Sequence, residues 1–140
     1  MRLAMGARVE PLLLAITTAC RRGLEVELFV SEEGDQAMVY HAQRSYYEAL
    51  LRGGVRIFMY RRPYILHTKS LTIDDDIAVI GSSNMDMRSF GLNLEISMLV
   101  RGEEFVAQMR AVEDRYRASS RALTLEEWEQ QPLRSTVLDN

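Results

Sequence analysis

Residues 66–84 read Leu-His-Thr-Lys-Ser-Leu-Thr-Ile-Asp-Asp-Asp-Ile-Ala-Val-Ile-Gly-Ser-Ser-Asn, and this stretch decides how the chain is interpreted. The segment from Ile65 to Ile73 predicts a strand, because apolar and β-branched residues dominate it. Asp74 to Asp76 predict a turn, and Ile77 to Ile80 a second, short strand. We therefore expect two strands joined by an acidic turn, followed by a loop or helical turn from Gly81 to Gly91.

His67 and Lys69 are the first candidates for chemistry. Side chains alternate faces along a strand, so residues two apart project to the same side. Imidazole can attack phosphorus and leave again, because the phosphohistidine that it forms is labile. An ammonium group beside it can neutralise a non-bridging phosphate oxygen. This spacing predicts a phosphodiester site with His67 as nucleophile.

The end of the stretch adds groups that suit an anion. Gly81 permits close approach of another backbone, Ser82 offers a hydroxyl and Asn84 an amide donor. We expect Lys69, Ser82 and Asn84 to bind phosphate. Asp74 is expected to hold the turn rather than touch substrate, and three adjacent carboxylates at a turn are usually solvated, so no metal is expected there.

The full pattern is far more specific than its parts. A single histidine on a strand, or a single Gly-Ser-x-Asn, is ordinary in any protein. Six fixed positions at average usage match by chance in roughly two per million chains of this length. Sixteen of the seventeen Lys and Arg residues are arginine, and the one lysine is Lys69. Arginine is a poor substitute where a compact ammonium is required.

The rest of the chain alternates helix and strand. Beyond the motif, the patterns predict helices from Pro11 to about Arg22, Gln36 to Arg52 and Glu103 to Ser119, a short helix after the capping box Thr124–Glu127, and strands over Leu24–Val30, Val55–Met59 and Leu92–Val100. This order predicts an α/β fold, a three-layer α-β-α sandwich with a mixed sheet. We expect a single domain over 1–140, with 124–140 as a C-terminal extension.

Composition narrows the class of protein. A chain of 140 residues with 47% apolar and 26% charged residues is typical of a soluble globular domain. The net charge of −3 argues against a nucleic-acid binder with a broad basic surface, although Arg61 and Arg62 could line a local groove. The single Cys20 excludes an internal disulfide. No apolar run approaches the roughly 20 residues that span a bilayer.

The motif His67-x-Lys69-x4-Asp74-x6-Gly81-Ser82-x-Asn84 resembles that of the phospholipase D superfamily. Its flanks are similar to the C-terminal catalytic half of bacterial cardiolipin synthases. The likeness extends from about Val9 to about Arg134. The matching segments are Arg44–Leu51, Gly54–Ile57, Leu66–Lys69, Gly81–Asp86, Arg88–Phe90, Leu92–Glu95 and Leu123–Trp128.

The resemblance implies a phosphatidyltransferase that needs no metal, nucleotide or other cofactor. His67 would attack the phosphorus of phosphatidylglycerol, and the hydroxyl of a second phosphatidylglycerol would displace it, giving cardiolipin. Glu95 matches a family carboxylate that steadies the histidine. The resemblance therefore implies four catalytic residues, namely His67, Lys69, Asn84 and Glu95. The resemblance also implies a peripheral position on the cytoplasmic side of the bacterial cytoplasmic membrane.

The chain departs from the family pattern in three ways. Family synthases have two such motifs facing each other, with the second histidine serving as general acid and base, and this chain has one. His41 has no lysine two residues later, and we expect it on a helix face. The family's membrane helices have no counterpart here. Residues Met1 to Arg8 replace the apolar strand that precedes the first helix, so we expect that strand to be missing.

Three interpretations stay open. The chain is a partial cardiolipin synthase that needs a missing N-terminal half. Alternatively it is a self-sufficient phosphodiesterase or nuclease that pairs two copies of His67 and Lys69 in a homodimer. In the third interpretation it is a non-catalytic remnant that folds or binds an anionic partner.

Overall fold

The computed structural model describes residues 2–4, 10–33, 46–83 and 94–130. Predictions that fall on His41, Asn84, most of the helix expected from Gln36 and the first part of the strand expected from Leu92 lie outside this part.

Within the described ranges, seven strands form one mixed sheet in the order β6-β5-β4-β1-β2-β3-β7. The strands are β1 (Arg2–Ala4), β2 (Glu27–Ser31), β3 (Arg56–Tyr60), β4 (Ser70–Ile73), β5 (Ile77–Gly81), β6 (Ser97–Arg101) and β7 (Ser120–Leu123). The neighbouring strands β1, β2 and β3 are parallel, and all other pairings are antiparallel. The sheet therefore combines a parallel centre with antiparallel edges.

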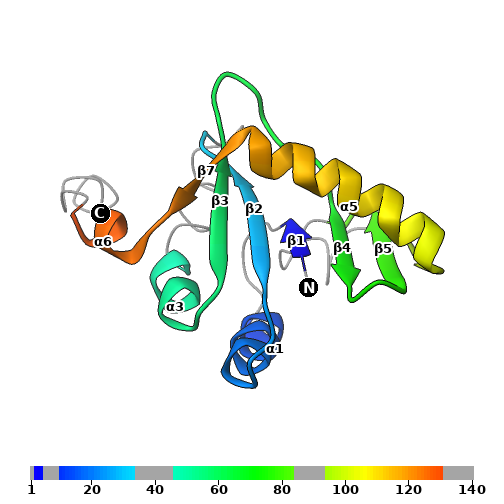
Figure 1. Ribbon diagram of the computed structural model, residues 1–140, viewed down its shortest axis with the longest axis horizontal. Coiled ribbons are helices and arrows are strands. Elements are labelled where there is room, and N and C mark those ends of the chain that lie inside the picture. Colours follow the sequence, from blue (N-terminus) through cyan, green and yellow to red (C-terminus); the bar gives the residue numbers. More distant parts are fainter. Residues whose placement is uncertain (1, 5–9, 34–45, 84–93, 131–140) are drawn as a thin grey trace.

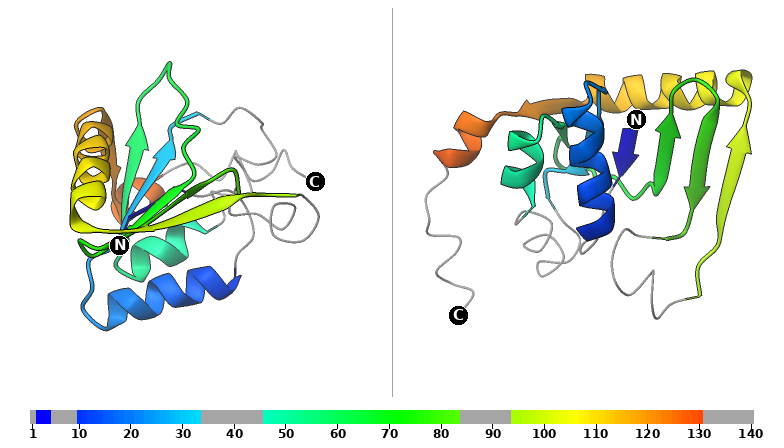
Figure 2. Two further views of the ribbon diagram at one scale, coloured as in Figure 1. Left: turned by 90° about the vertical axis from the view of Figure 1, so that its right-hand side faces the viewer. Right: turned by 90° about the horizontal axis from the view of Figure 1, so that it is seen from below.

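Helices cover both faces of this sheet. Figure 1 shows α5 (Glu103–Ala118) along one face, with α1 (Glu10–Arg21) and α3 (Tyr47–Arg52) against the other. A short helix, α6 (Leu125–Glu129), follows β7 and contacts α3. Figure 2 shows the same layers from two further sides. The predicted three-layer α/β architecture is confirmed.

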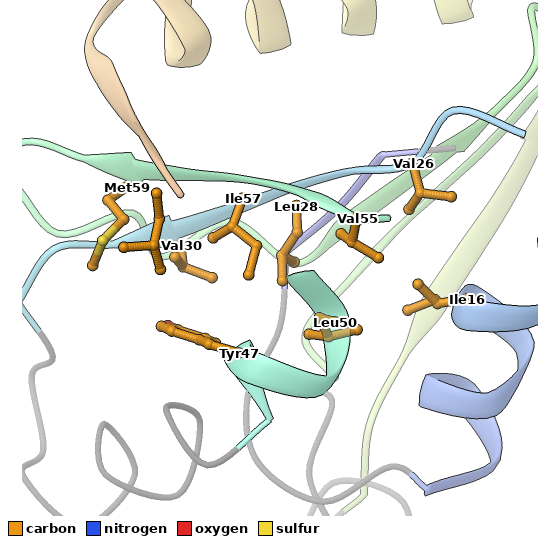
Figure 3. Packing of buried hydrophobic residues seen from close by; sticks show 10 residues of the cluster. Ile16, Val26, Leu28, Val30, Tyr47, Leu50, Val55, Ile57 and Met59 are labelled. Atoms are coloured by element: carbon orange, nitrogen blue, oxygen red, sulfur yellow. The ribbon is translucent and has the colours of Figure 1, made fainter. Parts of the chain in front are cut away.

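The main core lies between the parallel strands and the helices α1 and α3. Figure 3 shows side chains of β2 and β3 and of the residues just before them pointing toward Tyr47 and Leu50 of α3 and Ile16 of α1. Tyr47, Leu50 and Ile16 are each at most 2% exposed. Burying one large apolar side chain contributes about 1.5–3 kcal/mol, so this cluster accounts for much of the stability. Its buried members are Ile16, Val26, Leu28, Val30, Tyr47, Leu50, Val55, Ile57, Met59 and Leu123.

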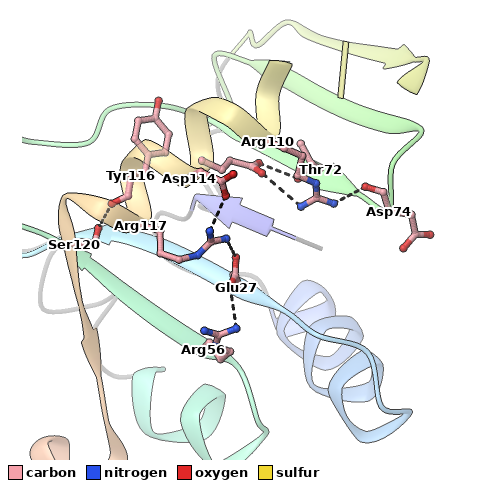
Figure 4. A network of polar contacts seen from close by, with 10 residues as sticks. Glu27, Arg56, Thr72, Asp74, Arg110, Asp114, Tyr116, Arg117 and Ser120 are labelled. Atoms are coloured by element: carbon pink, nitrogen blue, oxygen red, sulfur yellow. Dashed lines mark hydrogen bonds and ion pairs between the residues drawn. The ribbon is translucent and has the colours of Figure 1, made fainter. Parts of the chain in front are cut away.

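The opposite face of the sheet joins α5 through buried polar contacts, drawn in Figure 4. Glu27 of β2 is 7% exposed and accepts a hydrogen bond from Arg117 of α5 at 2.6 Å, while Arg56 lies 3.2 Å away. The bond to Glu27 raises the pKa of Arg117 above its ordinary value. Thr72 of β4 donates to the buried Glu113 of α5 at 2.8 Å. Because a buried carboxylate is costly without partners, these contacts fix where α5 lies on the sheet.

Two helix boundaries lie where the sequence predicts them. Helix α1 ends at Arg21, and Gly23 follows with a φ of 86° while its amide donates to Cys20 O at 2.9 Å. Glycine suits that left-handed conformation because it has no Cβ. Thr124 caps α6, and its hydroxyl accepts from the Glu127 amide at 3.1 Å. Both predicted helix boundaries are confirmed.

The expectation of a missing first strand is wrong. Arg2–Ala4 form β1, which pairs with β2 in parallel and with β4 antiparallel, so it lies in the interior of the sheet. Three residues are too few to show a strand period. Backbone hydrogen bonds on two sides nevertheless hold them, and backbone pairing does not depend on an apolar sequence.

Strand β7 was not predicted. Ser120–Leu123 contain no β-branched residue, yet they pair antiparallel with β3 and complete that edge of the sheet. Leu123 is 4% exposed and belongs to the core. Arg121 donates to Glu32 Oε1 at 2.7 Å and thereby ties the strand to the end of β2. Tertiary pairing decided this strand, because local propensity did not favour one.

Two predicted strands are shorter than expected. Of Ile65–Ile73 only Ser70–Ile73 pair as β4, so His67 and Lys69 precede the strand. Of Leu92–Val100, the described strand begins at Ser97, and its apolar side chains are exposed rather than buried, including Met98 at 58%. Strand β6 is the edge of the described sheet, where one row of backbone groups has no neighbouring strand. No helix in the described part of the chain is long and apolar enough to cross a membrane.

Candidate active site

The segment that carries His67 crosses the edge of the sheet at which the parallel strands end. The Leu66 amide donates to Ser31 Oγ, at the end of β2, at 2.8 Å. The carbonyl of Lys69 accepts from the Gly81 amide, at the end of β5, at 3.1 Å. Ligand sites of open α/β sheets lie at the carboxyl ends of parallel strands. The backbone on both sides of His67 is thus held at the edge where such a site is expected.

His67 and Lys69 are brought together. The Lys69 ammonium lies 3.0 Å from Nε2 and 3.1 Å from Nδ1 of His67 and donates to the His67 carbonyl at 2.9 Å. The imidazole is exposed, so a substrate can reach it. A fixed positive charge within 3.1 Å of the ring nitrogens would lie close to the oxygens of any phosphate that the ring attacks. The two side chains meet although this segment is not part of a strand.

A contact on the other side of the segment comes from α5. The Thr68 hydroxyl lies 3.0 Å from the Tyr116 hydroxyl. The Tyr116 ring packs edge-on against Phe29 at 6.1 Å and Tyr60 at 6.0 Å between centroids. Thr68 is thus tied to a residue that two strands hold in place. The residue between His67 and Lys69 is anchored to the far layer of the molecule.

Gly81 has a steric role at the meeting of β5 and β6. A Cβ atom on Gly81 would lie 2.5 Å from Ile96 O and 2.5 Å from Ser97 Oγ. Real Cβ atoms do not approach so closely, so any larger residue would push β6 away. The glycine therefore allows β6 to lie directly beside the end of β5.

Ser82 and Glu95 lie against each other across the same pair of chain segments. Ser82 Oγ donates to Glu95 Oε2 at 2.5 Å and accepts from the Ile96 amide at 3.1 Å. The Ser82 amide donates to Ile96 O at 3.0 Å. In this arrangement the hydroxyl proton of Ser82 is directed at a carboxylate. The structure thus brings Ser82 and Glu95 together, beside the strand end that contacts Lys69, while Asn84 lies outside the described residues.

Asp74 lies at the other end of β4. It lies five positions after Lys69, which corresponds to roughly 16 Å along an extended chain. Its φ is 49°, and its carbonyl accepts from Arg110 of α5. Asp76, in the same turn, forms an ion pair with Arg101 of β6. These contacts are at the hairpin turn, away from His67.

Ser31 and Tyr116 were not among the residues predicted for the site. They lie 35 residues before Leu66 and 48 residues after Thr68. Sequence spacing carries no signal for contacts of that separation. Ser31 could be identified only as the end of a strand, and Tyr116 only as part of a helical apolar stripe.

Residues 3–116 match the family model described as "Cardiolipin synthase, PLD-like domain". The chain belongs to this family. It is 38% identical over 130 residues to cardiolipin synthase A of Serratia proteamaculans, a match that covers 93% of this chain. It is 39% identical over 124 residues to cardiolipin synthase A of Yersinia pestis, covering 89% of this chain. The chain spans about a quarter of the length of these curated relatives, 26% and 25% respectively.

Solved structures share the fold. The phospholipase D family member Nuc from Salmonella typhimurium superposes with a TM-score of 0.74 at 17% identity, over 88% of this chain and 80% of that one. The phosphatidylserine synthase from Haemophilus influenzae also gives 0.74 at 18% identity, over 96% of this chain and 36% of that one. The predicted phospholipase D-like fold is confirmed, and so is the resemblance to cardiolipin synthases.

Proposed function

We propose that this chain supplies one histidine–lysine half of a phosphatidyltransferase site of the cardiolipin synthase type. The observation that carries the proposal is the Lys69 ammonium, 3.0 Å from an exposed imidazole of His67. Membership of the cardiolipin synthase family supports the substrate class, a glycerophospholipid such as phosphatidylglycerol. The site would act without a cofactor.

The reaction proceeds in two displacements at phosphorus. In the first, a ring nitrogen of His67 forms a bond to phosphorus, and the bond to the glycerol oxygen breaks. In the second, the hydroxyl of another phosphatidylglycerol attacks, and the phosphorus–nitrogen bond breaks to give cardiolipin. Lys69 stabilises the negative charge on the non-bridging oxygens in both steps.

Each displacement also moves a proton. The departing glycerol oxygen must gain one, and the attacking hydroxyl must lose one. A second histidine facing the first could do both. We propose that it belongs to a second half of the site, contributed by a longer chain or by a second copy of this one. The longer chain is supported by the comparison in which this chain spans 26% of the length of a cardiolipin synthase A.

The roles of the remaining residues follow from their contacts. Glu95 and Ser82 would hold the start of β6 against the end of β5, which positions the chain next to Lys69. Gly81 makes this approach sterically possible. Asn84 is proposed to donate a hydrogen bond to the substrate phosphate. Asp74 is proposed to serve in the hairpin turn.

Turnover with and without His67 tests the proposal. The chain is incubated with phosphatidylglycerol, with product cardiolipin followed by mass spectrometry, and separately with bis-p-nitrophenyl phosphate. We expect His67→Gln to abolish turnover and the exposed surface variant Arg22→Gln to retain it. Equal turnover in wild type and His67→Gln would refute the role of His67. No turnover in either variant of a chain that is dimeric would favour the non-catalytic remnant, whereas a monomeric chain without turnover is what the partial synthase predicts.

Light scattering separates the two sources of the second half. A two-copy site requires a dimer at the concentration at which turnover is measured. A strict monomer at micromolar concentration would exclude the homodimeric phosphodiesterase and leave the partial synthase.

A further inference from the structure

The connection between β3 and β4 carries an exposed group of basic and apolar side chains directly before His67. All five residues from Arg61 to Ile65 are exposed. Tyr64 is 71% exposed and Ile65 is 46% exposed, so two large apolar side chains face solvent side by side. Single exposed apolar residues are ordinary, but an adjacent pair shortly after two arginines suggests a contact surface.

This segment is held firmly at both ends. The Arg61 amide donates to Ser119 O at 3.2 Å, and the Leu66 amide donates to Ser31 Oγ at 2.8 Å. Figure 1 shows the connection arching beyond the ends of the strands, on the side of the sheet where β2 and β3 end. Tyr64 and Ile65, both exposed, therefore belong to this arching connection within three residues of His67.

Apolar side chains also lie in the segment just before β6. Leu94 and Ile96, on either side of Glu95, are 105% and 78% exposed. Ile96 is bonded to Ser82, next to Gly81, whose amide reaches the carbonyl of Lys69. Further exposed apolar groups thus lie next to Ser82, whose neighbour Gly81 contacts Lys69.

The charge of the segment indicates what it contacts. Arg61 and Arg62 are exposed guanidinium groups, and Arg62 forms an ion pair with Glu33 at 3.7 Å in which both side chains are more than half exposed. An exposed pair of that length contributes little, so an anionic partner can compete for the arginine. Basic side chains beside Tyr and Ile are typical of segments that lie in a bilayer interface, where apolar groups enter and guanidinium groups meet phosphate.

We propose that residues Arg61–Ile65 are a docking loop that inserts Tyr64 and Ile65 into an anionic lipid bilayer and brings His67 to the level of the phosphates. The inference extends the proposed function, since it names the surface that presents the substrate to that site. An alternative partner with the same charge, a nucleic acid, is an outcome of the test.

Vesicle sedimentation with the full chain tests the docking loop. Vesicles contain either phosphatidylglycerol mixed with phosphatidylcholine or phosphatidylcholine alone. We expect wild type to sediment with the anionic vesicles, and the double variant Tyr64→Ser/Ile65→Ser to bind at least tenfold more weakly. The matched control is Leu24→Ser, which removes a 53% exposed apolar side chain shortly before β2, at the opposite edge of the sheet. It should bind like wild type.

The arginines are tested separately. Each basic residue near an anionic membrane contributes about fivefold to binding. Arg61→Gln/Arg62→Gln should therefore weaken binding to anionic vesicles by about 25-fold and reduce its dependence on salt.

Three results would overturn the docking loop. The double variant could bind like wild type, or Leu24→Ser could lose as much binding, which would mark non-specific adhesion. A single-stranded oligonucleotide could also displace the vesicles and require Tyr64 for its own binding, which would assign the loop to nucleic acid. His67→Gln should retain vesicle binding. Vesicle binding does not require turnover. An absence of turnover would therefore count against the proposed function and would not affect the test of the docking loop.

Discussion

The hydroxyl groups of Thr68 and Tyr116 lie 3.0 Å apart, and this contact joins the residue between His67 and Lys69 to helix α5. Tyr116 in turn packs against Phe29 in the middle of β2 and against Tyr60 at the end of β3. The position of the candidate nucleophile therefore depends on the third layer of the fold, which is distant in sequence.

Removing the Tyr116 hydroxyl should loosen this segment while the ring packing stays. We expect Tyr116→Phe to lower the free energy of unfolding by about 1 kcal/mol, the typical loss for one hydrogen bond. Phosphodiester turnover should fall several-fold with little change in KM. Thr68→Val removes the same bond from its other partner. If this hydrogen bond accounts for the effects, the double variant should lose no more stability and turnover than either single variant. Additive losses in the double variant would contradict this explanation.

A side chain at Gly81 should separate β5 from β6. We expect Gly81→Ala to lower the free energy of unfolding by about 1–3 kcal/mol, because the new Cβ would collide with backbone at Ile96. Turnover should fall further than stability alone explains, since Ser82 and Glu95 move with the strands.

Gly23→Ala provides the comparison for that variant. Gly23 also disfavours a side chain, because its φ is 86°, but no atom lies within 4 Å of its Cβ position. We expect a loss of about 1 kcal/mol in denaturant unfolding and unchanged turnover. Equal loss of turnover in both variants would show that Gly81 has no special connection to the site.

Lys69→Arg keeps the positive charge and changes its shape. A planar guanidinium cannot replace a compact ammonium 2.9 Å from the His67 carbonyl and 3.0 Å from its ring. We expect kcat to fall by about 10²-fold or more, comparable with the loss of one charge-stabilising donor. The conservative variant Arg22→Lys, on the exposed surface, should leave kcat unchanged. Turnover of Lys69→Arg within twofold of wild type would show that charge alone is sufficient.

Acid should weaken the attachment of β7. The hydrogen bond from Arg121 holds the pKa of Glu32 below its ordinary value of 4.5. A depressed pKa contributes stability that is present above 4.5 and is lost as pH falls through the folded-state pKa. Thermal unfolding should therefore show wild type and Glu32→Gln converging as pH falls below 4.5. The exposed Glu126→Gln serves as control, and a constant difference between wild type and Glu32→Gln at all pH values would contradict the linkage.

Some features follow from local chemistry and could be predicted from the sequence. Gly23 and Thr124 mark helix ends because a left-handed residue and a hydroxyl cap act within a few residues. His67 and Lys69 meet as their spacing of two residues predicted, even though the segment that carries them precedes β4. The family motif likewise depends only on sequence spacing.

Other features depend on segments far apart in the chain. Arg2–Ala4 and Ser120–Leu123 become strands because neighbouring strands supply backbone hydrogen bonds, which no local pattern reveals. Ser31 and Tyr116 approach the His67 segment only after the sheet and α5 have packed. A strand within Leu92–Val100 could be predicted, but the exposure of Met98 and Leu99 depends on the place of β6 at the edge of the described sheet. By itself the sequence determined the α/β class and the candidate pair His67 and Lys69, since both follow from local patterns. Only the tertiary structure decided what holds that pair in place and which apolar side chains stay exposed around it, because long-range packing sets both.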